Sequence, residues 1–271
     1  MSKNFTVNGV GFGNRHPLAL IAGPCVIESR KNIMDIAARL VRMANHLDVP
    51  LVFKASYDKA NRTSIYSYRG PGISKGLEIL AEVREKYNIP ILTDVHNVEE
   101  IHIASQVVDI IQLPAFLVRQ TDFVIAAGES GCAVNVKKAQ FAAPWDMTQV
   151  IKKIESTGNT KILLTERGTS FGYNTLVADM RSLIIMREMG YPVIFDATHS
   201  VQSPGGQGDS SGGDGRFAPS LAKAATAVGV DGLFIETHPN PEEALSDGPN
   251  MVPLRQMPAL WKKIVAIDAV K

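Results

Sequence analysis

Residues 18–25 read LALIAGPC, a short apolar run that ends in a cysteine able to bind a metal ion. Seven further apolar runs follow, and nearly all of them end in a polar or charged residue. The eight runs cover residues 18–22, 51–53, 91–93, 109–111, 133–136, 162–165, 193–195 and 233–235. Because segments with helical periodicity separate them, they predict parallel strands that alternate with helices. Eight such units favour an α/β fold of the closed (β/α)8 type, a TIM barrel, whose active site lies where the strands end.

The length of the chain fits one such barrel. It has 271 residues, against about 250 for a typical barrel, so we expect a single domain over residues 1–271. Residues 1–14 are expected to form a short β-hairpin, turning at Asn8 and Gly9, that covers the lower mouth of the barrel. Ser74 is expected to cap one helix. Apolar stripes predict the other helices at residues 32–47, 99–108, 120–127, 147–156, 176–189, 220–228 and 259–270.

Charge and composition exclude several classes of protein. The 28 basic and 27 acidic side chains are almost balanced, which gives no electrostatic case for a nucleic acid or an anionic membrane as partner. No apolar stretch approaches the roughly 18 residues of a membrane helix, and no apolar signal region follows the first residues. Cys25 and Cys132 are expected at opposite ends of the barrel, too far apart for a disulfide. We therefore expect a cytoplasmic protein with reduced thiols.

Two predicted loops, residues 56–73 and 200–217, are longer than the usual 2–6 or so residues between a strand and its helix. The second is so rich in glycine, serine and aspartate that it cannot pack a core. Taken alone, it could be a disordered surface loop. Because it follows a barrel strand at the catalytic end, we interpret residues 200–217 as a mobile lid over the site.

Five basic side chains are predicted to face one mouth of the barrel. Lys54, Lys137 and Arg167 end strands, and Lys59 and Arg62 lie on the loop after the second strand. Any one of them could form a structural salt bridge. A cluster of five with few partners is strongly unfavourable unless an anion fills it. Since five cations exceed the need of one monophosphate, they predict two anionic substrates, or one with several phosphate or carboxylate groups.

A second group of side chains has the chemistry of metal ligands. Cys25, His199 and Glu236 end the first, seventh and eighth strands, which are neighbours in a closed barrel, and Asp247 follows on the last loop. A thiolate, an imidazole and two carboxylates suit a divalent ion such as Zn²⁺, Fe²⁺, Mn²⁺ or Co²⁺. The alternative is that Cys25 is a small buried residue that only packs.

The residues that could transfer protons are less clearly indicated by the sequence than the cations or the metal ligands. Asp94, His96, Asp196 and His199 all lie at strand ends. Asp196 could equally serve only to orient a neighbour through a hydrogen bond. The sequence shows neither a serine nucleophile elbow nor the paired carboxylates of a glycosidase.

Several motifs near the strand ends resemble those of a known family. Besides AGPC at 22–25, they are FKAS at 53–56, DKANR at 58–62, QLPAF at 112–116, NVKK at 135–138, TERG at 165–168, DATHS at 196–200 and ETHP at 236–239. Together they resemble the 3-deoxy-D-manno-octulosonate 8-phosphate synthase family. The resemblance implies an enzyme that condenses phosphoenolpyruvate with D-arabinose 5-phosphate and water, releasing inorganic phosphate, for lipopolysaccharide (Kdo) biosynthesis.

The resemblance also implies roles for individual residues. Phosphoenolpyruvate would be held by Lys54, Lys59, Lys137 and Arg167. The sugar phosphate would be held by Asn61 and Arg62, with Arg119 supplied by a neighbouring subunit of a homotetramer. The remaining expected substrate contacts are Ser56, Thr63, Gln112 and His199. The expected catalytic residues are Lys59, Asn61, Asp94 and His199.

Comparison with two groups of related enzymes indicates which acceptor sugar the protein uses and whether it needs a metal ion. The related synthase that uses erythrose 4-phosphate has Lys-Pro-Arg where this chain has KANR at 59–62, which favours the pentose acceptor. That related activity remains the alternative, together with a sugar-phosphate sensor that lacks turnover, against which the metal ligands and the lid argue. Cys25 indicates the metal-dependent class, because metal-independent members carry asparagine at that position.

Overall fold

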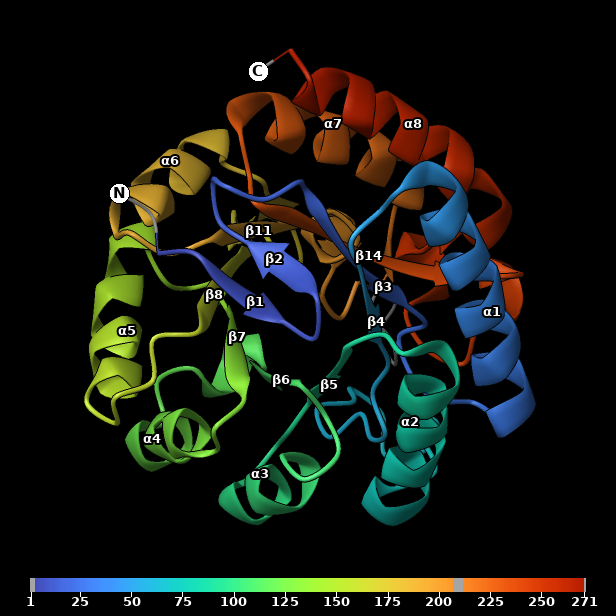
Figure 1. Ribbon diagram of the computed structural model, residues 1–271, viewed down its shortest axis with the longest axis horizontal. Coiled ribbons are helices and arrows are strands. Elements are labelled where there is room, and N and C mark those ends of the chain that lie inside the picture. The colour runs from blue at the N-terminus through green and yellow to red at the C-terminus, as the bar shows by residue number, and fades with distance from the viewer. Residues whose placement is uncertain (1–2, 207–211, 271) are drawn as a thin grey trace.

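Eight parallel strands close into a barrel in the computed structural model, which describes residues 3–206 and 212–270 (Figure 1). These strands are β3 (Ala19–Gly23), β4 (Leu51–Lys54), β5 (Ile91–Asp94), β6 (Ile110–Leu113), β7 (Ala133–Lys137), β8 (Ile162–Glu166), β11 (Val193–Asp196) and β14 (Gly232–His238). Gly232 of β14 pairs with Ala19 of β3 on one side and with Ile194 of β11 on the other, which closes the sheet. The predicted TIM barrel is confirmed.

Eight α-helices surround the barrel within the described residues (Figure 1). They are α1 (Arg30–Leu47), α2 (Ile73–Tyr87), α3 (Val98–Ala104), α4 (Thr121–Glu129), α5 (Met147–Glu155), α6 (Met180–Glu188), α7 (Ala218–Val228) and α8 (Met257–Asp268). In α1, Ile33, Ile36, Ala37 and Leu40 are buried at helical spacing, so this face packs on the strands. The Ser29 hydroxyl accepts a hydrogen bond from the Asn32 N–H and caps the start of α1.

Two helix starts differ from the sequence-based expectation. Ser74 does not cap α2, because Gly72 lies before the first turn in a left-handed conformation (φ 82°) and its N–H donates to the Tyr57 carbonyl. That turn starts the helix one residue before Ser74. The predicted helix at residues 176–189 begins only at Met180, where Asp179 accepts a hydrogen bond from the Arg181 N–H. The preceding residues form β10 (Leu176–Val177), which pairs with β9 (Thr169–Ser170).

The predicted hairpin is confirmed at the N-terminal end of the barrel (Figure 1). It consists of β1 (Phe5–Val7) and β2 (Val10–Phe12), joined by Asn8 and Gly9 with φ of 41° and 84°. Two left-handed residues are what a tight two-residue hairpin turn requires. Val7, Val10 and Phe12 form one apolar cluster with inward-facing strand residues, so the hairpin closes the lower mouth.

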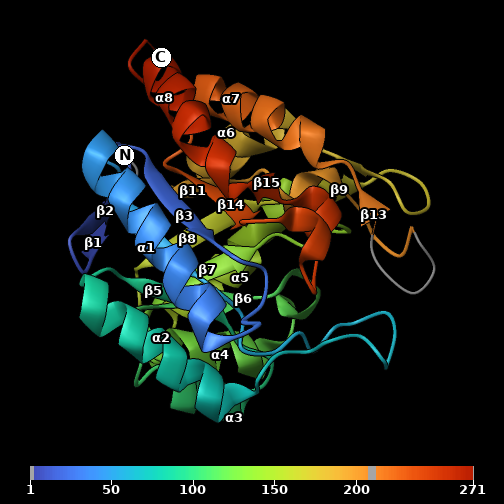
Figure 2. The same ribbon diagram turned by 90° about the vertical axis from the view of Figure 1, so that its right-hand side faces the viewer.

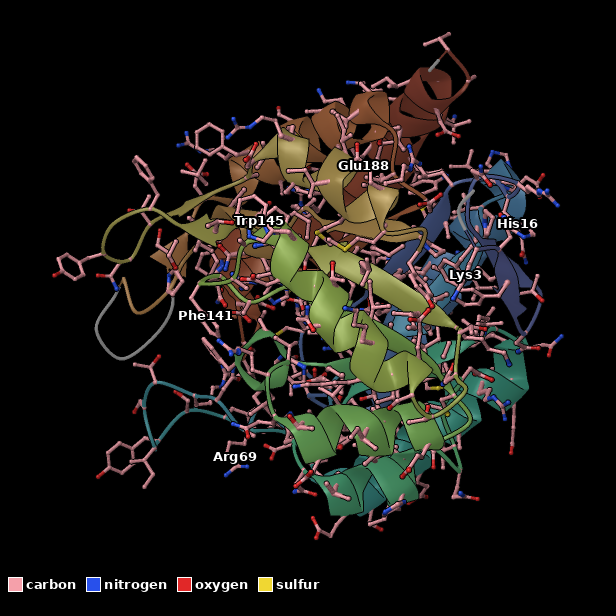
Figure 3. The ribbon with its side chains drawn as sticks, turned by 90° about the vertical axis from the view of Figure 1, so that its left-hand side faces the viewer. Lys3, His16, Arg69, Phe141, Trp145 and Glu188 are labelled. Atoms are coloured by element: carbon pink, nitrogen blue, oxygen red, sulfur yellow. The ribbon has the colours of Figure 1, made fainter. Side chains whose placement is uncertain are left out.

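The loops that follow the strands all project from the opposite end. Figure 2 shows the loop after β4 and the loop after β11 extending from that end, away from β1 and β2. In Figure 3, Lys3 and His16 lie at the hairpin end, whereas Arg69 and Phe141 lie toward the other end. The second loop carries β12 (Gln202–Ser203), paired with β13 (Gly212–Gly213), and the last loop carries β15 (Val252–Pro253), paired with β14. Residues 207–211 of the predicted lid lie outside the described residues, and the lid remains a prediction.

Among residues 3–206 and 212–270, no helix combines the length and the apolar character needed to cross a membrane.

The hairpin generates a prediction about stability. Phe12 is fully buried at the lower mouth, so Phe12→Ala should lower the free energy of unfolding by about 3–5 kcal/mol, as expected when a large buried ring is removed. Urea unfolding would measure the change. Thr6→Ala, at an exposed position of the same hairpin, is the control and should change it by less than about 0.5 kcal/mol. Equal effects of the two substitutions would show that the hairpin does not contribute to the core.

Candidate functional site

A cavity opens at the C-terminal end of the barrel, on the side away from the hairpin. Its walls come from the ends of β4, β5, β6, β7, β8 and β11 and from the loops that follow them, together with the loop after β14. The residues predicted from the sequence that line it are Lys54, Lys59, Asn61, Arg62, Thr63, Asp94, His96, Gln112, Lys137, Arg167, Asp196, His199 and Asp247. The barrel therefore brings together most of the predicted site.

Two of the five predicted cations are paired with buried carboxylates. The Lys54 ammonium donates to Glu236 Oε1 at 3.0 Å, and also to the Ser56 hydroxyl. The Lys137 ammonium donates to Asp196 and lies 3.2 Å from the centre of the Phe234 ring. The expectation that all five cations have few partners was therefore wrong, because carboxylates at the ends of distant strands point into the same mouth.

The other three cations contact neutral oxygens. Lys59 Nζ lies 3.2 Å from the Ser56 hydroxyl oxygen, and it has no carboxylate within 4 Å among the described residues. Arg62 donates to the carbonyl oxygens of Tyr68 and Leu245, at 2.9 Å each. Arg167 donates through Nη2 to Gln202 Oε1 at 2.9 Å, while its buried Nη1 has no hydrogen-bond partner among the described residues. These three side chains leave positive charge and donors available to an anion in the cavity.

Burial and charge shift the pKa values of these groups in opposite directions. Burial lowers the pKa of Lys137 to about 8, despite the opposing effect of Asp196. Burial also lowers the pKa of Arg167. For Lys59, burial acts in the same sense, but the charges of Cys25, Asp94 and other nearby acids outweigh it and raise the pKa. Among the described lysines that line the cavity, Lys137 is therefore one that can lose its proton near pH 8.

Asp94 and His96 form a hydrogen-bonded pair on the wall of the cavity. Asp94 accepts a hydrogen bond from the Ser56 hydroxyl, and its Oδ2 lies 3.3 Å from His96 Nε2. Burial opposes ionisation of Asp94, but Lys59 and Lys54 outweigh it and hold its pKa well below the usual range. Burial lowers the pKa of His96, but Asp94 and Glu100 outweigh it and raise the pKa. Asp94 is thus ionised at neutral pH and can accept a proton, but it cannot donate one.

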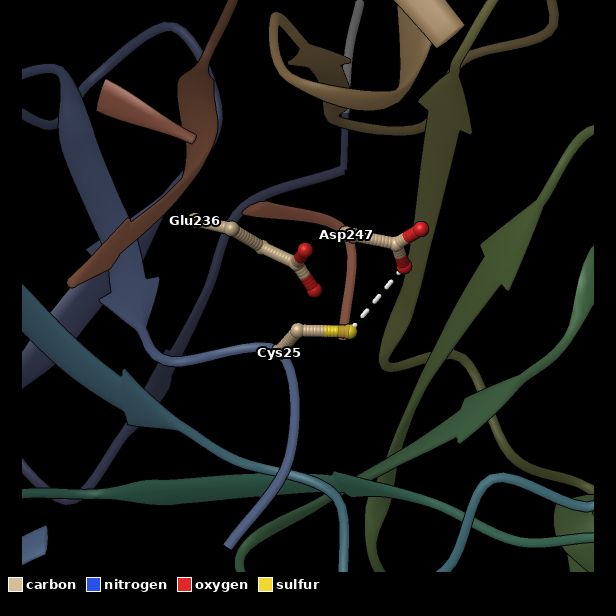
Figure 4. A group of neighbouring side chains, drawn as sticks. All are labelled: Cys25, Glu236 and Asp247. Atoms are coloured by element: carbon tan, nitrogen blue, oxygen red, sulfur yellow. Dashed lines mark hydrogen bonds between the residues drawn. The ribbon is translucent and has the colours of Figure 1, made fainter. Parts of the chain in front are cut away.

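A sulfur and two carboxylates converge beside the cavity (Figure 4). Cys25 follows β3, Glu236 lies within β14 and Asp247 lies on the loop after β14, and one ligand atom from each falls within 4.8 Å of the others. Cys25 Sγ lies 3.1 Å from Asp247 Oδ2 and 3.0 Å from the Ser246 hydroxyl. Asp247 adopts a left-handed backbone (φ 50°), uncommon for a residue other than glycine, which directs its carboxylate toward the sulfur.

These three residues could hold a metal ion. Glu236 Oε2 is buried without a hydrogen-bond partner among the described residues, a costly arrangement unless a cation lies nearby. Burial, then the charges of Asp247 and Glu236, raise the pKa of the Cys25 thiol well above its usual range. A bound cation would reverse that effect, since a coordinating thiol is deprotonated. The donor set of one sulfur and two carboxylates suits a borderline divalent ion better than Mg²⁺.

His199 stands next to this group but is not part of it. Its Nδ1 lies 2.8 Å from Asp196 Oδ2, and its Nε2 lies 3.8 Å from Glu236 Oε1. Such a carboxylate on one ring nitrogen commonly orients the other toward a ligand position. His199 as a fourth metal ligand remains a prediction.

Two predicted substrate contacts lie outside the cavity wall. Ser56 is fully buried between Lys54, Lys59 and Asp94, where it connects the three. Arg119 is exposed and does not line the cavity, and its carbonyl accepts a hydrogen bond from Lys153. Their roles in substrate binding remain predictions.

Comparison with known proteins identifies the family of this chain. Residues 3–268 match the DAHP synthetase I family. The chain belongs to that family. It is 56% identical to the 2-dehydro-3-deoxyphosphooctonate aldolase of Geobacter metallireducens over 270 residues, which span 100% of this chain and 99% of the relative. It is 60% identical to the protein of the same name from Granulibacter bethesdensis over 265 residues, which span 98% of this chain and 94% of the relative.

The structure also adds residues that sequence reasoning did not assign in this member of the DAHP synthetase I family. Gln140, Gln202 and Phe116 line the cavity. Asp196, for which the sequence left proton transfer and an orienting role open, accepts a hydrogen bond from Lys137 and lies 2.8 Å from His199 Nδ1. Gln140 and Gln202 each follow a strand end by only a few residues. Their place just after a strand end could have indicated that they line the cavity, but an uncharged glutamine does not by itself suggest a catalytic or binding role.

The shifted pKa of Lys137 generates a prediction for this family member. Because its pKa is lowered to about 8, its positive charge is present below that pH and is lost above it. Affinity for sulfate, whose charge is constant in this range, should therefore fall as the pH rises from about 7 to about 9. Calorimetric titration would measure it.

A matched variant separates Lys137 from the other cations. Lys137→Arg keeps its charge throughout this range, so its sulfate affinity should fall less with rising pH than that of the wild type. A wild-type affinity that does not change across this range would contradict the assignment of the titrating charge to Lys137.

Proposed function

We propose that the protein condenses phosphoenolpyruvate with D-arabinose 5-phosphate and water, forming 3-deoxy-D-manno-octulosonate 8-phosphate and inorganic phosphate, for lipopolysaccharide (Kdo) biosynthesis. The observation that carries the proposal is full-length identity of 56–60% to several proteins named 2-dehydro-3-deoxyphosphooctonate aldolase. A cavity whose free cations suit phosphorylated anions supports it.

The cations of the cavity divide between the two substrates in this proposal. Phosphoenolpyruvate binds Lys54, Lys59, Lys137 and Arg167. The sugar phosphate binds Asn61, Arg62 and Thr63. Ser56 and Gln112 complete these contacts. Two phosphorylated anions repel each other, and nearby cations offset that repulsion in a site that excludes water. Holding the reacting carbons in place can itself contribute up to about 7–11 kcal/mol to the reaction.

The chemical steps define what the side chains must do. The methylene carbon of phosphoenolpyruvate attacks the aldehyde carbon, positive charge develops at the enol carbon, and negative charge develops at the aldehyde oxygen. Lys59 and Asn61 donate hydrogen bonds to that oxygen, which takes up a proton. Water adds to the enol carbon and loses a proton toward the ionised Asp94. The new hydroxyl then loses its proton to the departing phosphate as the carbon–oxygen bond breaks, so a ketone forms and inorganic phosphate leaves. The proton lost when water adds balances the proton that the aldehyde oxygen takes up.

A divalent metal ion completes the proposed site. Cys25, Glu236 and Asp247, with His199 as fourth ligand, would hold Zn²⁺, Fe²⁺, Mn²⁺ or Co²⁺. Such an ion supplies Lewis acidity to a substrate oxygen when it is bound. His199, oriented by Asp196, would then serve both the metal and the substrate.

A homotetramer in the cytoplasm is the proposed form of the enzyme. Phe116, Phe141 and Trp145 are each more than half exposed, and Phe141 and Trp145 lie on one flank of the molecule in Figure 3. Exposed aromatic side chains of this kind support contact with another subunit. Arg119, exposed in one chain, would reach the sugar phosphate of its neighbour.

The choice of acceptor tests the proposal against its alternative, a related enzyme that uses erythrose 4-phosphate. Asn61 in DKANR at 58–62 favours the pentose. We expect kcat/KM for arabinose 5-phosphate to exceed that for erythrose 4-phosphate by at least about a hundredfold, because polar groups built for a longer acceptor stay unpaired with a shorter one. Phosphate release from phosphoenolpyruvate measures both. Equal or reversed values would favour the alternative.

Metal dependence is tested on the same protein. Chelation should abolish phosphate release, and Zn²⁺, Fe²⁺, Mn²⁺ or Co²⁺ should restore it. Cys25→Ala should bind Co²⁺ more weakly by more than about a hundredfold, because loss of a residue that only supports a ligand already costs about tenfold to a hundredfold, and it should not regain activity at moderate metal concentration.

Cys132→Ala is the matched control for metal binding, because Cys132 is a buried thiol whose Sγ donates to the backbone carbonyls of Ser105 and Val108 and does not line the cavity. It should bind Co²⁺ like the wild type. Full activity of a preparation shown by elemental analysis to be free of metal would refute the metal assignment and leave Cys25 as a packed thiol.

A further inference from the structure

The loop that carries Asp247 is held from two sides at Leu245. The Leu245 N–H donates to Glu28 Oε1 at 2.9 Å. The Leu245 carbonyl accepts a hydrogen bond from Arg62 Nη2, also at 2.9 Å. One residue of the loop after β14 therefore joins the start of α1 to the loop after β4.

Glu28 is itself fixed by the helix and strand beside it. Its Oε2 accepts a hydrogen bond from Asn32 Nδ2 at 2.8 Å and lies 3.3 Å from His238 Nε2. Its side chain is only 14% exposed. Because Asn32 lies in α1 and His238 ends β14, one oxygen of Glu28 is anchored to rigid elements while the other holds the loop.

Leu245 adjoins the site in two ways: Ser246 and Asp247 follow it in the sequence, and Arg62 binds its carbonyl oxygen. Asp247 Oδ2 and the Ser246 hydroxyl lie within 3.1 Å of Cys25 Sγ. On the other side, Arg62 lines the cavity and also donates to the Tyr68 carbonyl. The Tyr68 hydroxyl in turn donates to the Ile27 carbonyl, next to Glu28.

We infer that Glu28 is a positioning residue. Through Leu245, it fixes the position of the Arg62 guanidinium and the position of Asp247 next to Cys25. Its two carboxylate oxygens suit this role, because one accepts from the anchor and the other from the loop. The part that concerns Arg62 rests on the proposed function, whereas the part that concerns Cys25 and Asp247 requires only that the group binds a metal.

Kinetics test the first part. Glu28→Ala should raise the KM for arabinose 5-phosphate about tenfold or more, the loss expected when a hydrogen bond to a charged group is removed. The KM for phosphoenolpyruvate should change by less than about twofold, because Lys54, Lys137 and Arg167 lie at or next to strand ends and Lys59 Nζ contacts Ser56 rather than Leu245. Glu28→Gln keeps an acceptor oxygen for Leu245 and should show a smaller change in the same direction. Equal changes in both KM values, or no change, would overturn this part.

A control and a double mutant separate positioning from general destabilisation. Glu82→Ala removes a partly exposed carboxylate that pairs with Arg30, beside the same end of α1, and should leave both KM values unchanged. In an Arg62→Ala background, Glu28→Ala should add less than about twofold to the KM for the sugar phosphate, because the residue through which it acts is gone. Fully additive effects would show that Glu28 does not act through Arg62.

Cobalt binding tests the second part without turnover. Glu28→Ala should weaken Co²⁺ binding about tenfold and reduce the thiolate-to-cobalt absorption band, as expected when a supporting contact of a ligand is lost. Glu82→Ala should match the wild type. Unchanged Co²⁺ affinity in Glu28→Ala would overturn this part.

The KM measurements and the Co²⁺-binding measurements also distinguish failure of this inference from failure of the proposed function. A wild type that binds Co²⁺ but does not use arabinose 5-phosphate would refute the proposed function, and the cobalt arm would still decide the role of Glu28. If Glu28→Ala fails to fold, as judged by thermal melting, Glu28→Gln is measured in the same way. A Gln variant that folds and leaves both Co²⁺ affinity and KM for the sugar unchanged would then overturn the inference.

Discussion

The pairing of β14 with both β3 and β11 is the contact on which the rest of the structure depends. Without it the first and last strands would be free edges, and Cys25 and Glu236 would lie at opposite ends of an open sheet. Closure places the Cys25 sulfur and a Glu236 carboxylate oxygen within 4.8 Å of each other and brings His199 next to them. The site is therefore a property of the closed barrel as a whole.

Closure also determines how charge is balanced inside the mouth. Glu236 and Asp196 come from strands distant in sequence from Lys54 and Lys137, yet they meet them as buried ion pairs. Pairs of this kind offset the cost of burying each ion and add little net stability. What they provide is fixed geometry, so that the cations with neutral partners, Lys59, Arg62 and Arg167, are free to meet an anion.

The fold and much of the site could be predicted because their signals are local. Each apolar run and the polar residue that follows it lie within a few positions in the sequence, and the barrel brings those ends together. Partnerships across strands, such as Asp196 with Lys137, could not be predicted because nothing in the local sequence specifies which carboxylate meets which cation. The start of α2 was missed for a similar reason, since the Gly72 N–H is satisfied by Tyr57 from another segment.

The position of the hairpin has a consequence for handling the protein. The Lys3 N–H donates to the Gly190 carbonyl, and its ammonium donates to Glu155, so the start of the chain is held at the closed end of the barrel. The cavity opens at the other end. A molecule attached to a sensor surface through its amino terminus would therefore present its open mouth to the flowing solution.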